Sequence, residues 1–300
     1  MYFLKKLIER YMFLAAYLRR DENIEGFEFN ELLHSLFRSA SVKRLGKGES
    51  FRPVPGNVTD GCRKVTVAGK TVYWPEEADP NGLMFTYWEV YRDVHGHMFD
   101  THGTELREDD VVFDCGACEG LFTVKAIEKG AGKVYCFEPG RKLADCLRAG
   151  IGREITDNRV EIAEMLLGSV NGELMFMEDP ANPSVGRILP AGAAKDASAY
   201  PVKITTIDDF CTEKSLGRLD YIKADVEGAE VDLVRGASKS IERFGPRLAI
   251  AVYHEPGNAR EIISLVRNID RRYTFRLKGL ACHGGVVRPM ILHAVREDRD

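Results

Sequence analysis

From residue 109 onward, short β-rich apolar runs alternate with amphipathic helical runs along the chain. Such alternation predicts a mostly parallel sheet with helices on both faces, because each crossover between parallel strands passes over one face of the sheet. The expected fold class is therefore α/β. The predicted strands span 111–114, 133–137, 160–166, 202–206, 219–224, 247–253, 272–277 and 289–295, and the predicted helices span 121–129, 140–150, 229–244 and 258–269.

The N-terminal segment predicts a separate amphipathic helix. Apolar residues recur there at helical spacing on one face, and basic residues flank them. We expect this face to pack on the main domain or on a second copy of the chain, although a basic helix with large apolar residues can also dock on a membrane surface. The apolar stripe consists of Leu4, Leu7, Ile8, Tyr11, Leu14, Ala15 and Leu18, and the basic residues are Lys5, Lys6, Arg10, Arg19 and Arg20.

The residues between this helix and the sheet divide into shorter stretches. A second helical pattern at 29–40 precedes a turn-rich stretch at 41–61. Two β-branched runs around an Ala-Gly pair predict a hairpin over 62–74, and 84–100 has a helical pattern. The expected organisation is an N-terminal helical extension and linker (1–60), a hairpin and helix leading into the core (61–108), and the main α/β domain (109–300).

A polar stretch at 171–200 interrupts the regular alternation. We expect this stretch to be irregular, and to serve either as a lid over a substrate or as a surface loop without order. As a lid it would offer Asn182, Ser184 and Arg187 as hydrogen-bond donors.

Composition narrows the classes of function. The chain has 300 residues, of which 44% are hydrophobic, and this is enough for one large core with an appendage. Its net charge of −4 argues against a nucleic-acid partner, which would require a cationic surface, and favours a small organic substrate. The seven cysteines are odd in number and scattered, which favours reduced thiols in a cytoplasmic protein. Charged residues interrupt the apolar N-terminal run, so we predict neither a membrane-spanning helix nor a secretion signal.

The first chemical signal lies in the turn after the first strand of the sheet, in "VVFDCGACEG" (111–120). Gly116 and Gly120 allow the backbone to approach a ligand closely, because glycine has no Cβ. The turn is not a dinucleotide-binding G-x-G-x-x-G motif, and its acids Asp114 and Glu119 oppose a pyrophosphate. These acids suit a ligand of positive or neutral charge, such as the sulfonium and ammonium groups of S-adenosylmethionine.

A second signal follows at the end of the next strand, where "VYCFEP" places Glu138. A carboxylate at this position can accept hydrogen bonds from both hydroxyls of a ribose. Cys115 and Cys118 in the preceding turn have the spacing of a zinc half-site or of a redox pair. Because no second cysteine pair stands at finger spacing, we interpret both cysteines as small packing residues.

A second group of polar residues follows the strands predicted at 219–224 and 247–253. Asp225 and Glu227 follow the first of these strands and His254 follows the second, so all three reach the same edge of a parallel sheet. Three interpretations compete. One of these side chains takes a proton from a substrate hydroxyl, or the three hold Mg²⁺ or Mn²⁺, or they form a salt-bridge network at the strand ends.

Taken in order, five blocks of the sequence resemble the FkbM-type family of S-adenosylmethionine-dependent methyltransferases, and the resemblance covers about residues 105–296. It implies a Rossmann-like class I methyltransferase fold with a seven-stranded sheet. It also implies transfer of a methyl group from S-adenosylmethionine, usually to a hydroxyl of a sugar, glycolipid or natural product. The blocks are "VVFDCGACEGLFTV", "VYCFEP", "VKITTIDDF", "DYIKADVEGAEVDLVRGA" and "LAIAVYHEP".

The same resemblance implies roles for single residues. The first turn corresponds to the methionine part of the cofactor, Glu138 to its ribose, and the loop 164–166, with Met165, to its adenine. Cys118 stands where the family often has an amide, which affects local cofactor contacts and not the fold. The expected cofactor-binding residues are Asp114, Gly116, Cys118, Gly120, Glu138 and Met165, and the expected catalytic residues, which are also the candidate metal ligands, are Asp225, Glu227 and His254.

The expected reaction is in-line displacement at the sulfonium methyl group by a substrate hydroxyl. This reaction depends on alignment of the reacting atoms more than on acid or base catalysis. Two other classes of function stay open: a nucleotide-dependent oxidoreductase on a similar sheet, and a non-catalytic binding protein that keeps the cofactor fold.

Overall fold

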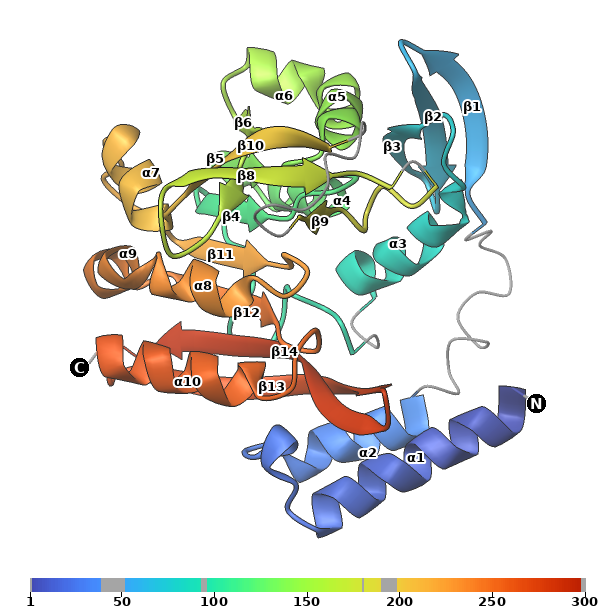
Figure 1. The fold of residues 1–300 in the computed structure, drawn as a ribbon, viewed down its shortest axis with the longest axis vertical. Coiled ribbons are helices and arrows are strands. Elements are labelled where there is room, and N and C mark those ends of the chain that lie inside the picture. The colour runs from blue at the N-terminus through green and yellow to red at the C-terminus, as the bar shows by residue number, and fades with distance from the viewer. Residues whose placement is uncertain (1, 39–51, 93–95, 180, 190–198, 298–300) are drawn as a thin grey trace.

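The computed structural model describes residues 2–38, 52–92, 96–179, 181–189 and 199–297. A seven-stranded sheet lies at its centre in the strand order β13-β14-β12-β11-β4-β5-β6 (Figure 1). The strands from β6 to β12 pair in parallel, whereas β14 is antiparallel to both of its neighbours, β12 and β13. The strands are β4 (Val111–Cys115), β5 (Lys133–Phe137), β6 (Val160–Ala163), β11 (Tyr221–Ala224), β12 (Arg247–Ala251), β13 (Tyr273–His283) and β14 (Val286–Arg296).

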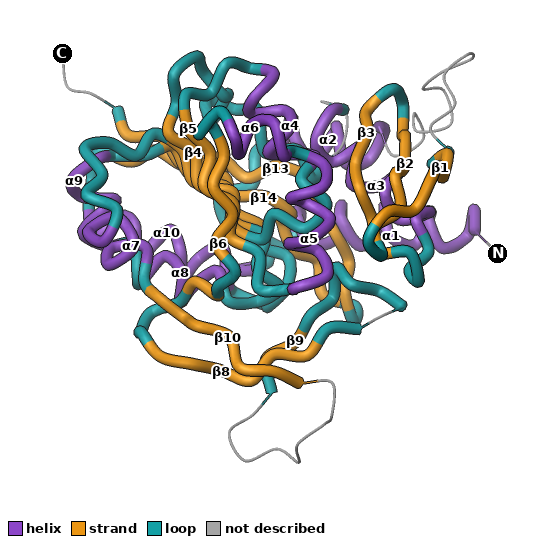
Figure 2. Tube along the Cα trace, turned by 90° about the horizontal axis from the view of Figure 1, so that it is seen from above, coloured by secondary structure: helices purple, strands orange, loops and turns teal. Residues whose placement is uncertain are grey.

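Helices cover both faces of this sheet, as predicted (Figure 2). One face carries α7 (Ile207–Glu213), α8 (Glu230–Arg235), α9 (Ser238–Phe244) and α10 (Asn258–Ile269). The other carries α3 (Leu83–Tyr91), α4 (Leu121–Glu128) and α5 (Arg141–Gly150), and the short α6 (Gly152–Thr156) follows α5. Successive strand residues point to opposite faces, so Phe113 and Ile222 belong to the first core and Val112 and Tyr221 to the second.

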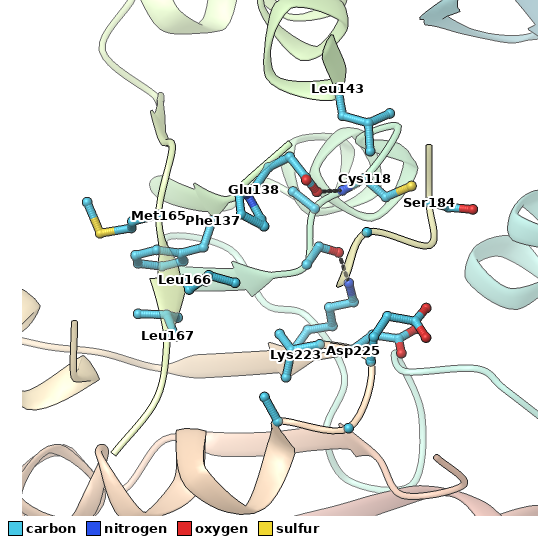
Figure 3. A pocket seen from close by; sticks show the side chains of 18 of the residues that line it. Cys118, Phe137, Glu138, Leu143, Met165, Leu166, Leu167, Ser184, Lys223 and Asp225 are labelled. Atoms are coloured by element: carbon cyan, nitrogen blue, oxygen red, sulfur yellow. Dashed lines mark hydrogen bonds between the residues drawn. The ribbon is translucent and has the colours of Figure 1, made fainter. Parts of the chain in front are cut away.

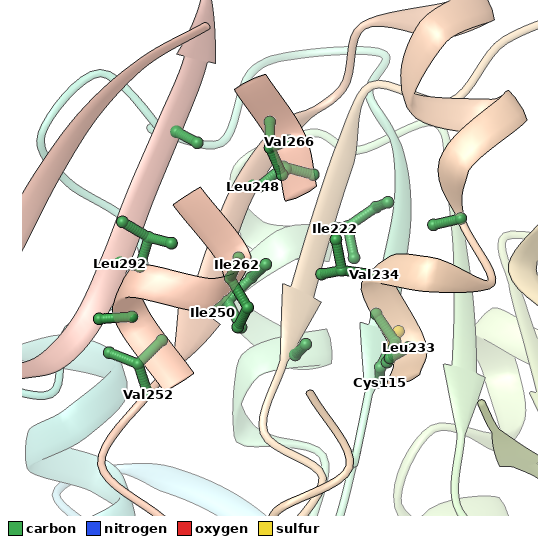
Figure 4. Close-up of a cluster of buried hydrophobic side chains, with 14 of the residues drawn as sticks. Cys115, Ile222, Leu233, Val234, Leu248, Ile250, Val252, Ile262, Val266 and Leu292 are labelled. Carbon is green, nitrogen blue, oxygen red and sulfur yellow. The ribbon is translucent and has the colours of Figure 1, made fainter. Parts of the chain in front are cut away.

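The core beneath α8 and α10 is made almost entirely of branched aliphatic side chains (Figure 4). Ile222, Leu248 and Ile250 project from adjacent parallel strands, and Ile262 and Val266 of α10 pack over them. A parallel sheet that is covered on both faces requires such near-continuous apolar strands.

Two smaller sheets flank the central one. The first is a meander of β1 (Val54–Thr59), β2 (Cys62–Val67) and β3 (Lys70–Pro75). The predicted hairpin over 62–74 is confirmed, but β1 lies in a stretch that we expected to form turns. Residues 39–51 of that stretch lie outside the described part of the chain.

The second small sheet has the order β7-β10-β8-β9 and corrects three predictions. Its strands are β7 (Leu166–Leu167), β8 (Gly172–Met177), β9 (Arg187–Ile188) and β10 (Ala199–Thr205). The expectation that 171–200 is irregular is wrong over 172–177 and 187–188. The strand predicted at 202–206 exists as β10 but pairs with β8 and β7 outside the central sheet, and the strand predicted at 160–166 divides into β6 and β7.

The helix predicted at 229–244 is two helices, α8 and α9. Asp208 accepts hydrogen bonds from the backbone N–H groups of Lys239 and Ser240 at 3.0 and 2.7 Å, and so caps a new helix start. Gly236 separates the two helices, and a Cβ there would lie 2.0 Å from the carbonyl oxygen of Gly168. This close approach explains the glycine and the break.

Three other elements differ from the predictions. Helix α7 was not predicted, although Thr206 caps it by accepting a hydrogen bond from the backbone N–H of Asp209 at 3.0 Å. Helix α3 ends at Tyr91, well short of the predicted end at residue 100, and residues 93–95 lie outside the described part of the chain. The final hairpin of β13 and β14 is longer than predicted.

The N-terminal extension consists of α1 (Tyr2–Leu18), a short 3-10 turn (Glu22–Ile24) and α2 (Phe29–Arg38), and another such turn (Pro80–Gly82) precedes α3. Phe13, Ala16 and Leu32 are buried in the same core as Phe113. The expectation that the predicted apolar stripe packs on the main domain is wrong, because the opposite face of α1 does so. Leu7, Ile8, Tyr11, Leu14 and Leu18 of the stripe are 52, 51, 68, 41 and 72% exposed. None of the helices among the described residues combines the length and hydropathy that a membrane span requires.

Candidate active site

A pocket of about 780 Å³ lies at the carboxyl edge of the central sheet. Residues after β4, β5 and β11 line its floor, α3 contributes one wall, and the small sheet of β7 to β10 contributes another. Figure 3 shows Glu138 and Cys118 at one end of this pocket and Asp225 at the other. Members of both groups of residues that the sequence singled out therefore line one cavity.

Two glycines allow the first turn to pack closely against neighbouring residues. Gly116 has a φ of +78°, and a Cβ there would lie 1.9 Å from the carbonyl oxygen of Asp225. Gly120 has a φ of +82°, and a Cβ there would lie 2.6 Å from Leu147 of α5. Gly116 lines the pocket and Gly120 does not, so only the first faces a ligand directly.

Asp114 lies beneath the turn in a fully buried ion pair. Its Oδ1 is 3.1 Å from the Nζ of Lys223, and its Oδ2 accepts a hydrogen bond from the hydroxyl of Thr123 at 2.7 Å. Lys223 also donates to the carbonyl oxygen of Gly116 at 2.6 Å. Burial disfavours its charge, but the carboxylates of Asp114 and Asp225 outweigh this and raise the pKa of Lys223. We expected Asp114 to line the pocket, but its side chain does not do so and instead supports the turn from below.

Glu138 lines the pocket and is held by two backbone donors. Its Oε2 accepts from the N–H of Cys118 at 2.9 Å, and its Oε1 accepts from the N–H of Gly140 at 2.8 Å. Burial raises the pKa of Glu138 to about 7 and outweighs both hydrogen bonds, which lower it. Burial likewise raises the pKa of Glu119, a pocket residue that sequence reasoning noted but did not assign, to about 7.

The two cysteines of the turn lie in different surroundings. Cys115 is buried in the core beside Leu233 (Figure 4), whereas Cys118 lines the pocket. Burial raises the pKa of both thiols well above the usual value, and the neighbouring carboxylates Asp114 and Glu119 add to this. Both side chains are therefore neutral thiols near pH 7.

An apolar wall faces Glu138. Phe137, Met165, Leu166 and Leu167 lie along one side of the pocket (Figure 3). Leu174, Phe176, Ile188 and Ile204 of the small sheet also line the cavity. Ser184 and Arg187 from the proposed lid reach the pocket, and Asn182 instead accepts a hydrogen bond from the hydroxyl of Ser184 at 2.8 Å.

At the other end of the pocket, Asp225 lies between two imidazoles. Its Oδ1 is 3.6 Å from the Nε2 of His254, and its Oδ2 is 3.7 Å from the Nε2 of His97. Each imidazole has its Nδ1 close to a glutamate oxygen, at 2.8 Å from Glu230 and 2.9 Å from Glu89 respectively. Burial raises the pKa of Asp225, and the positive charges of His97, Lys223 and His254 oppose this rise.

His254 does not line the pocket but lies behind Asp225 and Glu227. Burial disfavours its charge, but the contacts with Glu230, Asp225 and Glu227 outweigh this and raise the pKa of His254 to about 8. At neutral pH the imidazole is therefore mostly protonated. Of the three side chains that could take a proton from a hydroxyl, His254 therefore fits this role least, because it is protonated and does not reach the cavity.

His97 is the residue that sequence reasoning missed. It is buried, lines the pocket and packs edge-on against Tyr253, with ring centroids 4.8 Å apart. It lies after α3 in a segment that we expected to be helical. A lone histidine in such a segment gives no signal of function, and only the fold brings it to Asp225.

The proposed metal ligands are arranged differently from the prediction. Three side chains each present a ligand atom within 4.8 Å of the others, namely Asp225, Glu230 and His254. The predicted set contained Glu227 in place of Glu230. The Oε1 of Glu230 already accepts hydrogen bonds from the backbone N–H groups of Val226 and Gly228 at 3.1 and 3.3 Å, and contacts His254. These bonds occupy the oxygen that a cation would need, so the cluster fits a hydrogen-bond network better than a metal centre.

The strand order, the single antiparallel strand β14 and the pocket at the carboxyl edge define a class I methyltransferase fold. Residues 114–277 match the family model of the methyltransferase FkbM domain. Because this match covers more than half of the chain, the chain belongs to the FkbM methyltransferase family.

Curated relatives and a solved structure resemble the chain at low sequence identity. The chain is 22% identical over 151 residues to the 2-O-methyltransferase NoeI of Sinorhizobium fredii, over 46% of this chain and 61% of that protein. It is 23% identical over 216 residues to the 31-O-demethyl-FK506 methyltransferase FkbM of Streptomyces tacrolimicus, over 61% of this chain and 79% of that protein. The crystal structure of methyltransferase FkbM from Methylobacillus flagellatus KT has a TM-score of 0.45 and 21% identity, over 62% of this chain and 43% of that chain.

The tight fit of the turn gives a first prediction. Replacing Gly116 by alanine should lower the free energy of unfolding by about 3 kcal/mol or more, because the new Cβ meets the Asp225 carbonyl and φ is positive. Gly152→Ala is the matched control, since that position in α6 has open space around it and should change stability by less than about 1 kcal/mol. Urea unfolding of both variants measures the difference, and equal stabilities would contradict the packing described for the turn.

Proposed function

We propose that the protein transfers a methyl group from S-adenosylmethionine to a hydroxyl of a sugar, glycolipid or natural product. The observation that carries this proposal is the shared cavity, which Glu138 lines at one end and Asp225 at the other. The names of both curated relatives, an O-methyltransferase and a methyltransferase of an O-demethyl compound, support the choice of an oxygen acceptor.

The cofactor end of the pocket fits S-adenosylmethionine by its chemistry. Each oxygen of Glu138 keeps a lone pair beyond its backbone bond, so the carboxylate can accept the two ribose hydroxyls. Phe137 and Met165 offer an apolar surface for the adenine ring, and Glu119 lies where the positive charges of the methionine part would fall. When bound, S-adenosylmethionine supplies an electrophilic methyl group on a sulfonium.

The carboxylates in the pocket also favour methyl transfer over the two alternative functions, an oxidoreductase and a non-catalytic binding protein. A nucleotide-dependent oxidoreductase would place a pyrophosphate at the glycine turn, where the carboxylate of Glu119 lines the pocket and disfavours a second negative charge. A binding protein without activity would have no use for a half-buried Asp225 that lies between two imidazoles, each in contact with a glutamate.

At the acceptor end, Asp225 lines the cavity together with Glu227, Glu89 and His97. We assign the proton transfer to Asp225, because its carboxylate lies between the two imidazoles. Its raised pKa brings its basicity closer to that of an effective general base at neutral pH. His254 and His97 hold the carboxylate from both sides and fix its orientation. General base catalysis of this kind contributes about 10²- to 10⁴-fold, and alignment of oxygen, carbon and sulfur contributes up to about 7–11 kcal/mol.

The cofactor proposal predicts a pH-dependent affinity. S-adenosylhomocysteine should bind with a micromolar Kd, and its affinity should rise as the pH approaches about 7 and level off above it. The reason is that ribose hydroxyls favour the ionised form of Glu138, whose pKa binding therefore lowers. Calorimetry at several pH values measures both quantities, and NAD should give no heat.

Two variants sharpen this test. Glu138→Gln should weaken binding at least about tenfold, because the buried ribose acceptor loses its charge, and should remove most of the pH dependence. Glu173→Gln, at an exposed position of β8 outside the pocket, is the matched control and should bind like the unchanged protein. If NAD binds and S-adenosylhomocysteine does not, the oxidoreductase alternative is correct.

Turnover tests the acceptor end. With an acceptor identified by its mass shift in a panel of glycans and secondary metabolites, Asp225→Asn should lower kcat by about 10²- to 10⁴-fold. His254→Gln should lower kcat less, because it removes the contact that orients Asp225 and not the base itself. EDTA should leave the rate unchanged. A full rate with Asp225→Asn would refute the base assignment, and loss of activity in EDTA with recovery in Mg²⁺ would restore the metal interpretation.

We infer, in addition, that the exposed stripe of α1 docks the protein on the cytoplasmic surface of an anionic membrane. The stripe is defined by Leu7, Ile8, Tyr11, Leu14 and Leu18, and Arg19 and Arg20 at its end are exposed. A contiguous apolar face with basic residues beside it matches an interface of acyl chains and anionic headgroups, whereas two copies of it would bring like charges together.

Vesicle flotation tests this docking. The protein should float with vesicles of phosphatidylcholine and phosphatidylglycerol and much less with phosphatidylcholine alone, and binding should fall with added salt. Tyr11→Ser with Leu14→Ser should abolish flotation, whereas Phe85→Ser, at an exposed apolar position of α3, should not. Dimers in sedimentation that the double variant dissociates, without flotation, would show that the stripe joins two copies.

A further inference from the structure

Two cysteines far apart in the sequence meet in the core beside the pocket. The sulfur atoms of Cys62 and Cys146 lie 3.1 Å apart, although 84 positions separate the two residues in the chain. Cys62 begins β2 and Cys146 lies in α5, and the two residues are only 4 and 1% exposed. Both are free thiols in this structure.

The two elements that this contact joins belong to different parts of the fold. The meander of β1 to β3 packs against α5, as Figure 1 shows, and Lys142 of α5 pairs there with Glu77 at 3.4 Å. Helix α5 begins beside Glu138 and contributes Leu143 to the pocket. The cysteine pair therefore lies where the meander contacts the helix that supports the cofactor end of the pocket.

We propose that Cys62 and Cys146 form an oxidation site, whose product is a disulfide that fastens the β1–β3 meander to α5. The oxidant is a low-molecular-weight disulfide such as oxidised glutathione. Two S–H bonds break and one S–S bond forms in the protein, while the two electrons and two protons convert the oxidant into two thiols. The exchange passes through a mixed disulfide between one cysteine and the oxidant.

The other cysteines for which a sulfur contact is described have different partners. Cys136 lies 3.0 Å from the hydroxyl of Thr123, and Cys282 lies 3.8 Å from the sulfur of Met12. Cys118 and Cys211 are likewise hydrogen-bonded to Glu119 and Ser240. None of these contacts can yield a disulfide, whereas the contact between Cys62 and Cys146 can.

The surroundings of the pair determine how fast it reacts. Burial raises the pKa of Cys146, and the neighbouring Cys62 adds to this. Because the thiolate is the attacking species, the folded protein oxidises slowly at neutral pH and faster in alkaline solution. The same burial shields the finished bond from reductants, so the disulfide persists once the meander has docked.

The cross-link should stabilise the fold by restricting the unfolded chain. It closes a loop of 84 positions, and disulfides across loops of this size raise the Tm of a protein of this length by about 5 °C or more. It also keeps the meander against α5 and so restrains the helix next to Glu138.

Mass mapping of the full chain tests the proposal. The purified protein is incubated with oxidised glutathione at mildly alkaline pH, unfolded, alkylated with N-ethylmaleimide and digested. We expect a cross-linked peptide pair that contains Cys62 and Cys146, with the other cysteines alkylated. We also expect a higher Tm, which returns to the starting value after the protein is unfolded, reduced with dithiothreitol and refolded. Alkylation of both Cys62 and Cys146, or a cross-link between other cysteines, would overturn the proposal.

Variants separate the disulfide from other effects of oxidation. Cys62→Ala and Cys146→Ala should each lose both the cross-link and the shift in Tm, whereas Cys282→Ala should keep both. An oxidant-induced rise in Tm that survives in Cys62→Ala would contradict the assignment. The mapping of the unchanged protein decides the question even if a variant fails to fold, and it involves neither cofactor nor acceptor, so it is independent of the proposed function.

Discussion

The pocket depends on one buried ion pair, between Lys223 of β11 and Asp114 of β4. The register of the sheet places the two residues directly opposite each other, and their side chains are only 7 and 0% exposed. A buried charge without its partner costs several kcal/mol, so the two strands must keep this register at their carboxyl ends. Lys223 extends the constraint to the turn by donating to the carbonyl of Gly116. The pair thus fixes the relative position of the cofactor turn and of Asp225, two residues further along β11.

Because Lys223 pairs with Asp114, the remaining acidic side chains of the pocket form two groups, one at each end. Lys223 neutralises Asp114 below the floor, which leaves Glu119 and Glu138 as the acids of the cofactor end. Both are buried, and burial raises their pKa values to about 7, so a ligand that donates hydrogen bonds or carries positive charge stabilises their ionised forms. At the other end of the pocket, the imidazoles of His97 and His254 lie on two sides of the Asp225 carboxylate, and their positive charges oppose the rise in its pKa that burial causes.

The sequence predicted the parts of this arrangement that follow from local periodicity. Alternating strands and helices gave the parallel sheet, and the strand ends gave Glu138 and Asp225, because parallel strands end at one edge. Successive strand residues point to opposite faces, and Phe113 and Cys115 point into the core beneath α7 to α10. The sequence therefore already implied that Asp114 points to the other face, but the resemblance to the family placed Asp114 at the ligand. The face of α1 that packs was not predictable, because the helix is apolar on both sides and tertiary contacts with α2, β13 and β14 decide which side is buried. The small sheet, likewise, depends on pairing between β8 and β10, which lie far apart along a polar stretch.

The residues that escaped prediction lie outside the part of the chain that matches the family model. The match to the FkbM domain begins at residue 114, whereas Glu89 and His97 precede it. Both line the pocket at the acceptor end, and His97 contacts the same carboxylate as His254. The cofactor end is therefore built from segments shared with the family, while one side of the acceptor end comes from α3 and the residues after it. Since an enzyme selects its acceptor through the groups that surround the reacting hydroxyl, the specificity of this protein should reside largely in the segment that connects the meander to the central sheet.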